Sequence, residues 1–174
     1  GVGYDLGDTR APIVVVNFSD FGCPYCGSFA RETQPSLDKE FIRTGKVFFK
    51  YVPFVMGMFP NGDLAARASE CAADQGKFWP MHDALYASQS EWKRSGTPEV
   101  IFERYAKKSG IKPEEFAACF ADRRTDQRTS AATGGADRLR IRATPTFFVN
   151  GQMVEGAIPL DQFRLLLNGE LTGR

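Results

Sequence analysis

The sequence predicts an α/β fold in which a small β-sheet is flanked by helices and interrupted by an all-helical insertion. Three observations lead to it. Residues 12–18 and 46–54 have the β-branched and aromatic composition of strands. An Asn150-Gly151 pair separates two further short strands near the C-terminus. Residues 61–139 show helical periodicity instead, so the order is β-α-β, a helical block, and then α-β-β-α.

The N-terminal third is expected to form the β-α-β unit. The strand at residues 12–18 leads through a short loop into Cys23. From Pro24 onward the apolar residues recur at intervals of three and four, which is typical of a helix packed on one face. Pro35 should kink or interrupt this helix before the second strand at residues 46–54.

Helices are expected through the middle of the chain and at its end. The helical segments are residues 61–75, 77–88, 97–108, a segment that begins at 113, 125–139 and 159–167. Asn61 is a suitable cap for the first of them. The Asn150-Gly151 pair suits a type I′ turn, so residues 146–149 and 152–154 should form a hairpin.

The composition is that of one ordinary globular domain. The chain has 174 residues, of which 43% are hydrophobic and 25% charged, and this excludes a disordered chain. A net charge of +1 gives no general attraction to nucleic acid or membrane surfaces, and we expect no nucleic-acid partner. The composition therefore directs attention to its four cysteines, which are Cys23, Cys26, Cys71 and Cys119.

Four cysteines allow three complete pairings, and Cys23-Pro24-Tyr25-Cys26 allows three interpretations. It is a redox dithiol, half of a zinc site, or two incidental thiols. A zinc site needs two more soft ligands, and the remaining candidates, His82, Cys71 and Cys119, are isolated in the sequence. We therefore favour redox chemistry and expect neither a metal nor another cofactor.

Three segments, taken in order, resemble the DsbA-like branch of the thioredoxin superfamily. They are Phe18-Ser19-Asp20-Phe21-Gly22-Cys23-Pro24-Tyr25-Cys26, Gln75-Gly76-Lys77-Phe78-Trp79 and Ala143-Thr144-Pro145-Thr146-Phe147-Phe148-Val149-Asn150-Gly151. Cys-Pro-Tyr-Cys alone also occurs in glutaredoxins and disulfide isomerases, whereas the ordered set is specific. The resemblance implies a thioredoxin-like fold, with a central mixed β-sheet flanked by helices and an inserted all-helical subdomain.

The resemblance also implies a domain organisation and a location. Residues 1–60 and 129–174 would be the two parts of the thioredoxin-like domain, and residues 61–128 the helical insertion. The protein would be periplasmic or otherwise extracytoplasmic, which fits an oxidising compartment. Because the sequence starts at Gly1 without a basic or apolar leader, we expect a signal or anchor segment outside it.

Thiol–disulfide exchange requires a cysteine that ionises near neutral pH and can be reached by a substrate. Cys23 is placed where a helix begins, so unpaired N–H groups can stabilise its thiolate, and we expect it to be the nucleophile. Cys26 faces the core one turn later and is the expected resolving thiol. Pro24 and Tyr25 between them are expected to tune the reduction potential. The alternative is an inert disulfide.

The resemblance implies that the Thr144–Pro145 peptide bond is cis and that it faces the active disulfide. Its backbone would pair with an extended substrate, although an ordinary trans proline at the start of a strand is the alternative. Relatives usually carry a buried acid where this sequence has Asn17, which cannot act as a base. Lys50 matches a lysine that accompanies that acid, and it would therefore lack its carboxylate partner.

The resemblance further suggests a structural disulfide between Cys71 and Cys119, with two buried free thiols as the alternative. His82 is more consistent with a packed side chain than with a catalyst.

The predicted function is a DsbA-like oxidase that introduces disulfides into secreted proteins through Cys23 and Cys26. Its partners would be unfolded or reduced secreted proteins and a membrane redox partner, either a quinone-linked reoxidase or a reductase, and we expect a monomer. Two alternatives are a disulfide isomerase or reductase of the same fold, and a non-catalytic chaperone or binding module. A glutaredoxin fits less well, because of the large helical insertion.

Overall fold

The protein, described by a computed structural model over residues 2–173, is built on a five-stranded sheet in the order β1-β3-β2-β4-β5. The strands are β1 (Tyr4–Leu6), β2 (Ile13–Ser19), β3 (Val47–Pro53), β4 (Thr146–Val149) and β5 (Gln152–Glu155). β2 and β3 are parallel, and each of the other neighbouring pairs is antiparallel. The sheet is therefore mixed, which confirms the predicted fold class.

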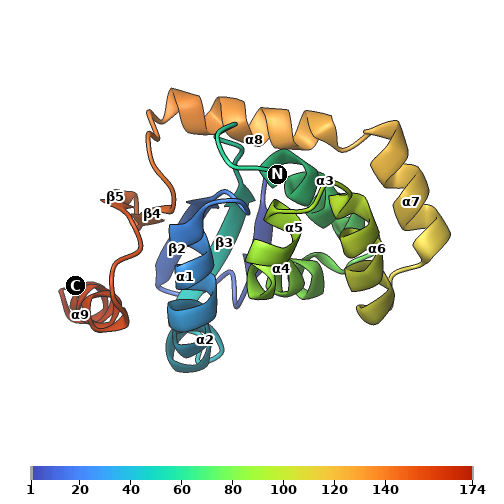
Figure 1. The fold of residues 1–174 in the computed structure, drawn as a ribbon. Coiled ribbons are helices and arrows are strands. Elements are labelled where there is room, and N and C mark those ends of the chain that lie inside the picture. The colour runs from blue at the N-terminus through green and yellow to red at the C-terminus, as the bar shows by residue number, and fades with distance from the viewer. Residues whose placement is uncertain (1, 174) are drawn as a thin grey trace.

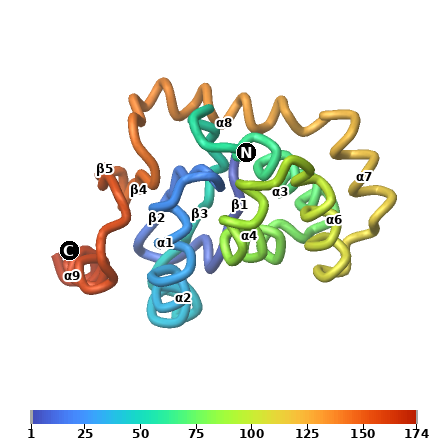
Figure 2. The backbone as a smooth tube through the Cα atoms, in the orientation of Figure 1, coloured from blue at the N-terminus to red at the C-terminus, as the bar shows by residue number. Residues whose placement is uncertain are grey.

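Helices surround this sheet and form the insertion between β3 and β4 (Figure 1). Between β2 and β3 lie α1 (Pro24–Ser28), the π-helical segment η1 (Phe29–Thr33), α2 (Gln34–Leu37) and the π-helical segment η2 (Asp38–Ile42). The later helices are α3 (Gly62–Ala73), α4 (Phe78–Ala87), α5 (Gln89–Lys93), α6 (Pro98–Lys108), α7 (Pro113–Asp122), α8 (Asp126–Arg138) and α9 (Leu160–Thr172). The backbone tube shows α8 crossing the molecule from α7 back to β4 (Figure 2).

The segment between β2 and β3 is not one regular helix. Pro35 lies in the first turn of α2, where a missing N–H costs no helical bond. The expected interruption at this residue takes the form of a change from the π-helical η1 to α2. π-helical turns are rare and occur often near functional sites.

Each face of the sheet is covered by its own hydrophobic cluster. On one face, residues such as Phe49 and Phe147 pack with Phe29 of η1 and Phe163 of α9. The same cluster continues into the helical insertion, so the two parts share one core. On the other face, Phe18 and its neighbours pack against the small side chains of α8.

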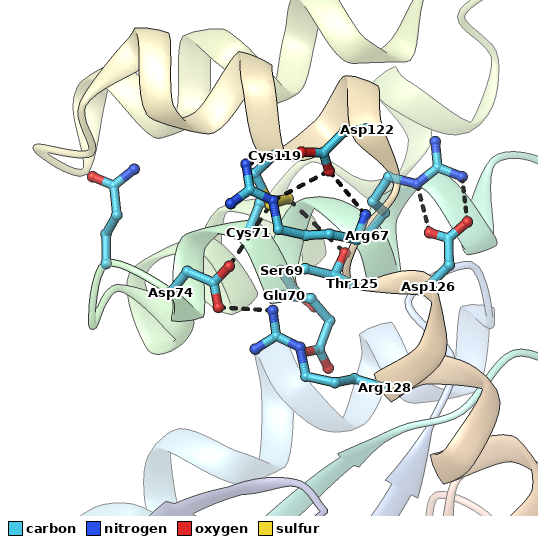
Figure 3. Close-up of a disulfide and its surroundings, with 12 residues drawn as sticks. Arg67, Ser69, Glu70, Cys71, Asp74, Cys119, Asp122, Thr125, Asp126 and Arg128 are labelled. Atoms are coloured by element: carbon cyan, nitrogen blue, oxygen red, sulfur yellow. Dashed lines mark hydrogen bonds and ion pairs between the residues drawn. A yellow bond between two sulfur atoms is a disulfide. The ribbon is translucent and has the colours of Figure 1, made fainter.

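A disulfide joins two helices of the insertion, as the resemblance implies. Cys71 of α3 and Cys119 of α7 are bonded, and both are buried. Close to this bridge, Arg67 of α3 binds Asp126 of α8 through two hydrogen bonds of 2.8 and 3.0 Å (Figure 3). α3 is thus fastened covalently to α7 and by a bidentate ion pair to α8.

Several elements differ from the sequence predictions. β1 and α5 are additional elements of only three and five residues. Asn61 does not cap α3, because it adopts a left-handed conformation and its amide donates instead to the carbonyls of Trp92 and Ser95. The predicted boundary at residue 128 falls inside α8, and the three-part division stays a prediction.

The predicted hairpin forms, with positive φ at both Asn150 and Gly151, as a type I′ turn requires. Among the helices of residues 2–173, none has the length and apolar character needed to cross a bilayer.

Candidate active site

Cys23 lies at the start of α1, directly after the loop that follows β2. Its backbone is extended, with φ −74° and ψ 124°, and its carbonyl accepts the N–H of Gly27 at 3.1 Å. Pro24 occupies the first turn and presets its φ angle. The first-turn N–H groups of Tyr25 and Cys26 are directed toward the Cys23 sulfur, where they favour the thiolate.

Cys23 and Cys26 are both free thiols, and their surroundings drive their pKa values apart. The pKa of Cys23 is lowered from about 9 to about 6, chiefly because the Cys26 thiol donates a hydrogen bond to the thiolate. Burial opposes this shift, and the side chain of Thr144 adds to it. With such a pKa, the thiolate is the main form of Cys23 at neutral pH.

Cys26 has the opposite behaviour. Its side chain is buried, and burial raises its pKa well above the ordinary value, with a further increase from the neighbouring Cys23. A hydrogen bond from Ser19 partly offsets this. The single hydrogen of the Ser19 hydroxyl is shared between the Cys26 sulfur and Asn17 Oδ1, which accepts it at 2.7 Å, so Asn17 is linked to Cys26 through one buried hydroxyl.

The register of the sheet brings the second part of the site next to Cys23. Phe18 of β2 is paired with Thr146 of β4, so the end of β2 lies beside the start of β4. The Thr144–Pro145 peptide bond immediately before β4 is cis. The Cys23 thiol donates to the Thr144 carbonyl at 3.3 Å. Residues that are 121 positions apart are therefore in direct contact.

Side-chain exposure differs sharply across the Cys-Pro-Tyr-Cys segment. Cys23 is 2% exposed and Cys26 is 1% exposed, whereas Tyr25 is 68% exposed. Only a small part of Cys23 therefore faces solvent, whereas Tyr25 between the two cysteines is open to it.

Comparison with known proteins identifies the family. The family model described as thioredoxin matches residues 2–169. The chain belongs to the thioredoxin family, in its DsbA-like branch. It is 31% identical over 177 residues to disulfide bond formation protein D of Bacillus subtilis, a match that covers 97% of this chain and 77% of that protein.

Two further similarities extend this finding. The crystal structure of oxidised BdbD from Bacillus subtilis superimposes with a TM-score of 0.89 at 29% identity, over 98% of this chain and 94% of that one. The chain is also 36% identical over 152 residues to Na(+)/H(+) antiporter NhaA 3 of Salinispora tropica. That match covers 86% of this chain and 22% of the antiporter, so the chain spans less than a quarter of this relative's length.

Lys50 is not at this thioredoxin-family site. On β3 it is paired in register with Val16, one residue before Asn17, so its side chain points to the opposite face of the sheet. It forms an ion pair with Asp5 of β1. The acid that would accompany Lys50 is replaced by Asn17, and Lys50 takes its carboxylate partner instead from Asp5 of β1, a strand that the sequence did not predict.

Three residues that sequence reasoning did not select also contact the site. Gln89 of α5 donates from Nε2 to the carbonyls of Phe21 and Cys23 at 2.6 and 2.8 Å. The buried carboxylate of Asp20 accepts the backbone N–H groups of Gly22 and Met56. Ser19 is the third residue, through its hydrogen bond to Asn17. Asp20, two residues before Gly22, carries a local Asx-turn signal, whereas Gln89 carries none because it comes from a distant helix.

His82 is packed, as expected. It is 1% exposed and makes ring contacts with Phe21, Tyr51 and Tyr86, and burial lowers its pKa. The Tyr51 and Tyr86 hydroxyls, 2.7 Å apart, lie beneath the loop, where the Tyr86 hydroxyl donates to the Asp20 carbonyl at 3.3 Å. This aromatic layer supports the Cys23 loop from below.

Proposed function

We propose that this chain is a thiol:disulfide oxidoreductase of the DsbA-like type, an oxidase that forms disulfides in secreted proteins through Cys23 and Cys26. The asymmetry of the pair carries the proposal. A thiol with a pKa of about 6 lies at a helix start, and the thiol that would resolve it is buried with a raised pKa. The relatives named for disulfide bond formation and protein-disulfide oxidoreduction support the same reaction.

In the oxidising direction, the pair begins as a disulfide. A substrate thiolate attacks the Cys23 sulfur, the new bond joins substrate to Cys23, and Cys26 leaves as a thiolate that takes up a proton. A second substrate thiolate then attacks the substrate sulfur of this mixed disulfide, and Cys23 leaves. The substrate loses two electrons and gains a disulfide, and the cysteine pair gains those two electrons.

The low pKa of Cys23 favours this direction. A thiolate with a low pKa is a good leaving group, so release of the oxidised substrate is fast. The Thr144 carbonyl lies 3.3 Å from the Cys23 sulfur, so the Thr144 backbone is placed where an extended substrate segment can pair with it.

Substrate class, redox partner and location are parts of the same proposal. We infer that the substrates are unfolded or reduced secreted proteins, that the protein acts as a monomer outside the cytoplasm, and that a membrane partner linked to quinone reoxidises the pair. The oxidising chemistry supports this location, because structural disulfides form and persist mainly in oxidising compartments.

The test is to trap the covalent intermediate. The oxidised protein is mixed with a reduced, unfolded protein, and disulfide formation is followed by mass spectrometry. We expect stoichiometric oxidation by the unmodified chain. We also expect a stable mixed disulfide at Cys23 when Cys26→Ala, activated at Cys23 with a small-molecule disulfide, meets a single-cysteine variant of the substrate, which has no second thiol to resolve it. Absence of exchange would overturn the proposal in favour of a binding module, and rearrangement of scrambled disulfides without net oxidation would favour an isomerase.

A further inference from the structure

The loop at residues 55–61, between β3 and α3, packs closely against residues 20–23, the loop that ends at Cys23. A Cβ atom on Gly22 would lie 2.4 Å from Phe59 Cβ, and one on Gly62 would lie 2.8 Å from Asp20 Oδ1. Contacts this short exclude a larger residue unless the loop moves. The two glycines therefore allow a close approach between segments that the sequence separates by about forty residues.

Asp20 is the polar link between these two segments. Its side chain is 1% exposed, and its two carboxylate oxygens accept different N–H groups. Oδ1 accepts from Gly22 at 2.8 Å, within the Cys23 loop, and Oδ2 accepts from Met56 at 2.8 Å, across the gap. The Asp20 backbone carbonyl also accepts the N–H of Cys23 at 3.1 Å. A buried carboxylate is tolerated only with such bonds, so its position and that of Met56 are coupled.

Met56 continues the link to the cis-proline loop. The Thr144 hydroxyl donates to Met56 Sδ at 3.4 Å, and the Thr144 carbonyl accepts the Cys23 thiol at 3.3 Å. The contacts close a ring that runs from Asp20 to Met56, to Thr144, to Cys23 and back to Asp20. Three separate segments of the chain meet in this ring around one sulfur atom.

We propose that Asp20 and Met56 are positioning residues of the active site: Asp20 holds Met56 so that its thioether sulfur competes with the Cys23 sulfur for the Thr144 hydroxyl hydrogen. This deepens the proposed function, because it rests on Cys23 as the reacting thiol. A hydroxyl has one hydrogen, which Met56 and a Cys23 thiolate cannot both receive. The thioether sulfur is a weaker acceptor than the Cys23 thiolate, so Met56 retains the hydroxyl hydrogen only part of the time.

The hold has a defined chemical consequence. When the Thr144 hydroxyl is released from Met56, it donates fully to the Cys23 thiolate and stabilises the charged form further. Met56 therefore moderates how strongly Cys23 ionises. Other charges that act on Asp20 itself are Lys93 and Asp63, so a variant of Asp20 alone mixes charge with geometry.

The test measures the pKa of Cys23 from its thiolate ultraviolet absorbance in the full chain. Met56→Leu keeps the size and apolar character of the side chain but removes the acceptor, and we expect the pKa of Cys23 to fall by about 0.5. Met58→Leu is the matched control, because Met58 belongs to the same loop and is 68% exposed. We expect no change there. Equal pKa values in both leucine variants and the unmodified chain would overturn the proposal.

Asp20→Asn tests the coupling. The asparagine side chain keeps one acceptor oxygen, but its NH₂ group replaces the other oxygen. It therefore faces the N–H of Gly22 or Met56 with a second donor, and Met56 is released. Loss of the Asp20 charge also lowers the pKa of Cys23, but that part persists when Met56 is already leucine. We therefore expect a smaller decrease from Asp20→Asn in the Met56→Leu background than in the unmodified chain, and equal decreases would contradict the proposal.

If Asp20→Asn does not fold, the Met56→Leu result still decides the question. Because the readout is a titration and needs no substrate, failure of disulfide exchange would refute the proposed function without affecting this inference.

Discussion

At the scale of single residues, Cys23 and Cys26 acquire opposite properties from positions only three residues apart. Cys23 receives a hydrogen bond from Cys26 and faces the N–H groups of the first helical turn. Cys26 is enclosed by the core, which disfavours its charged form. The chemistry therefore depends on where the helix begins, and the residue types alone do not determine it.

This asymmetry predicts how the reduction potential changes with pH. Reduction of the pair takes up two protons below the pKa of Cys23 but only one above it, because Cys23 then stays a thiolate and Cys26 remains protonated. For a two-electron couple the slope should change from about 59 mV per pH unit to about 30 mV near pH 6. Equilibration with a glutathione buffer across pH 4–8 (roughly the range around this pKa) measures it. A constant slope through this range would contradict the lowered pKa.

The lowered pKa of Cys23 also determines how the stability of the reduced form changes with pH. The folded-state pKa of Cys23 is depressed, so its contribution to the stability of the reduced form is fully present above the unfolded-state pKa. It declines as the pH falls and is lost once the pH passes through about 6. The oxidised form carries no such contribution, so raising the pH should increase the free energy of unfolding of the reduced form relative to that of the oxidised form.

Asn17 occupies the position where the family resemblance implies a buried acid. It is buried and bonded to Ser19, which contacts Cys26. Asn17→Asp would place a base next to Cys26, separated from it only by the Ser19 hydroxyl. We therefore expect oxidation of the reduced protein by glutathione disulfide to accelerate about tenfold or more at neutral pH. The unpaired buried carboxylate should also destabilise the protein.

Asn17→Ala is the control, since it removes the amide without adding a base. Stopped-flow measurement of the oxidation rate against pH distinguishes the two variants. If Asn17→Asp leaves both the rate and its pH profile unchanged, the proton role assigned to this position is incorrect.

At the scale of elements, the disulfide between α3 and α7 provides a direct measure of how firmly the insertion is held. Cys71 and Cys119 are 48 residues apart, and closing such a loop in the unfolded chain corresponds to about 4 kcal/mol. We expect the Cys71→Ala/Cys119→Ala double variant to lose a free energy of unfolding of this order in urea titrations.

The same variant should retain exchange activity, because neither residue contacts Cys23 or Cys26 in the structure. A loss well below 1 kcal/mol (less than the usual range of about 2–4 kcal/mol) would show that the bridge contributes little. Loss of activity in a variant that remains folded would show instead that the insertion and the active site are coupled.

Much of the element order followed from sequence patterns, and the exceptions have physical reasons. β2 and β3 are long enough to show strand composition, whereas the three residues of β1 cannot display a period. Because β1 was not predicted, its residue Asp5 could not be recognised as the partner of Lys50. By contrast, the start of a helix at Cys23 was predicted, because the proline signal for a helix start lies in the adjacent residues.

The remaining site residues depend on contacts that have no local signal. Asp20 and Met56 are brought together by a loop without periodicity, and Gln89 reaches the site from a short helix of the insertion. Such contacts are decided by tertiary packing, so no sequence window contains them. The positions that were predicted are those where chemistry and local backbone geometry coincide.

At the scale of the whole molecule, the sheet brings the site together and the helices enclose it. The antiparallel pairing of β2 with β4 places the cis-proline loop beside Cys23, and α5 of the insertion fixes the loop carbonyls from the other side. The insertion and the sheet share one hydrophobic cluster, so the site is held by a single continuous core. This rigidity maintains the two unequal thiols in contact.

The central claim is that this arrangement makes the Cys23–Cys26 pair a strong oxidant, because it stabilises the reduced form through the Cys23 thiolate. Equilibration of the pair with reduced and oxidised glutathione at pH 7 tests the claim most directly, with alkylation and mass spectrometry to separate the two states. The account predicts a reduction potential above that of thioredoxin-type reductants, shifted toward the roughly −120 mV of the strongest protein oxidants. A value near −270 mV, about that of a thioredoxin-type reductant, would contradict it.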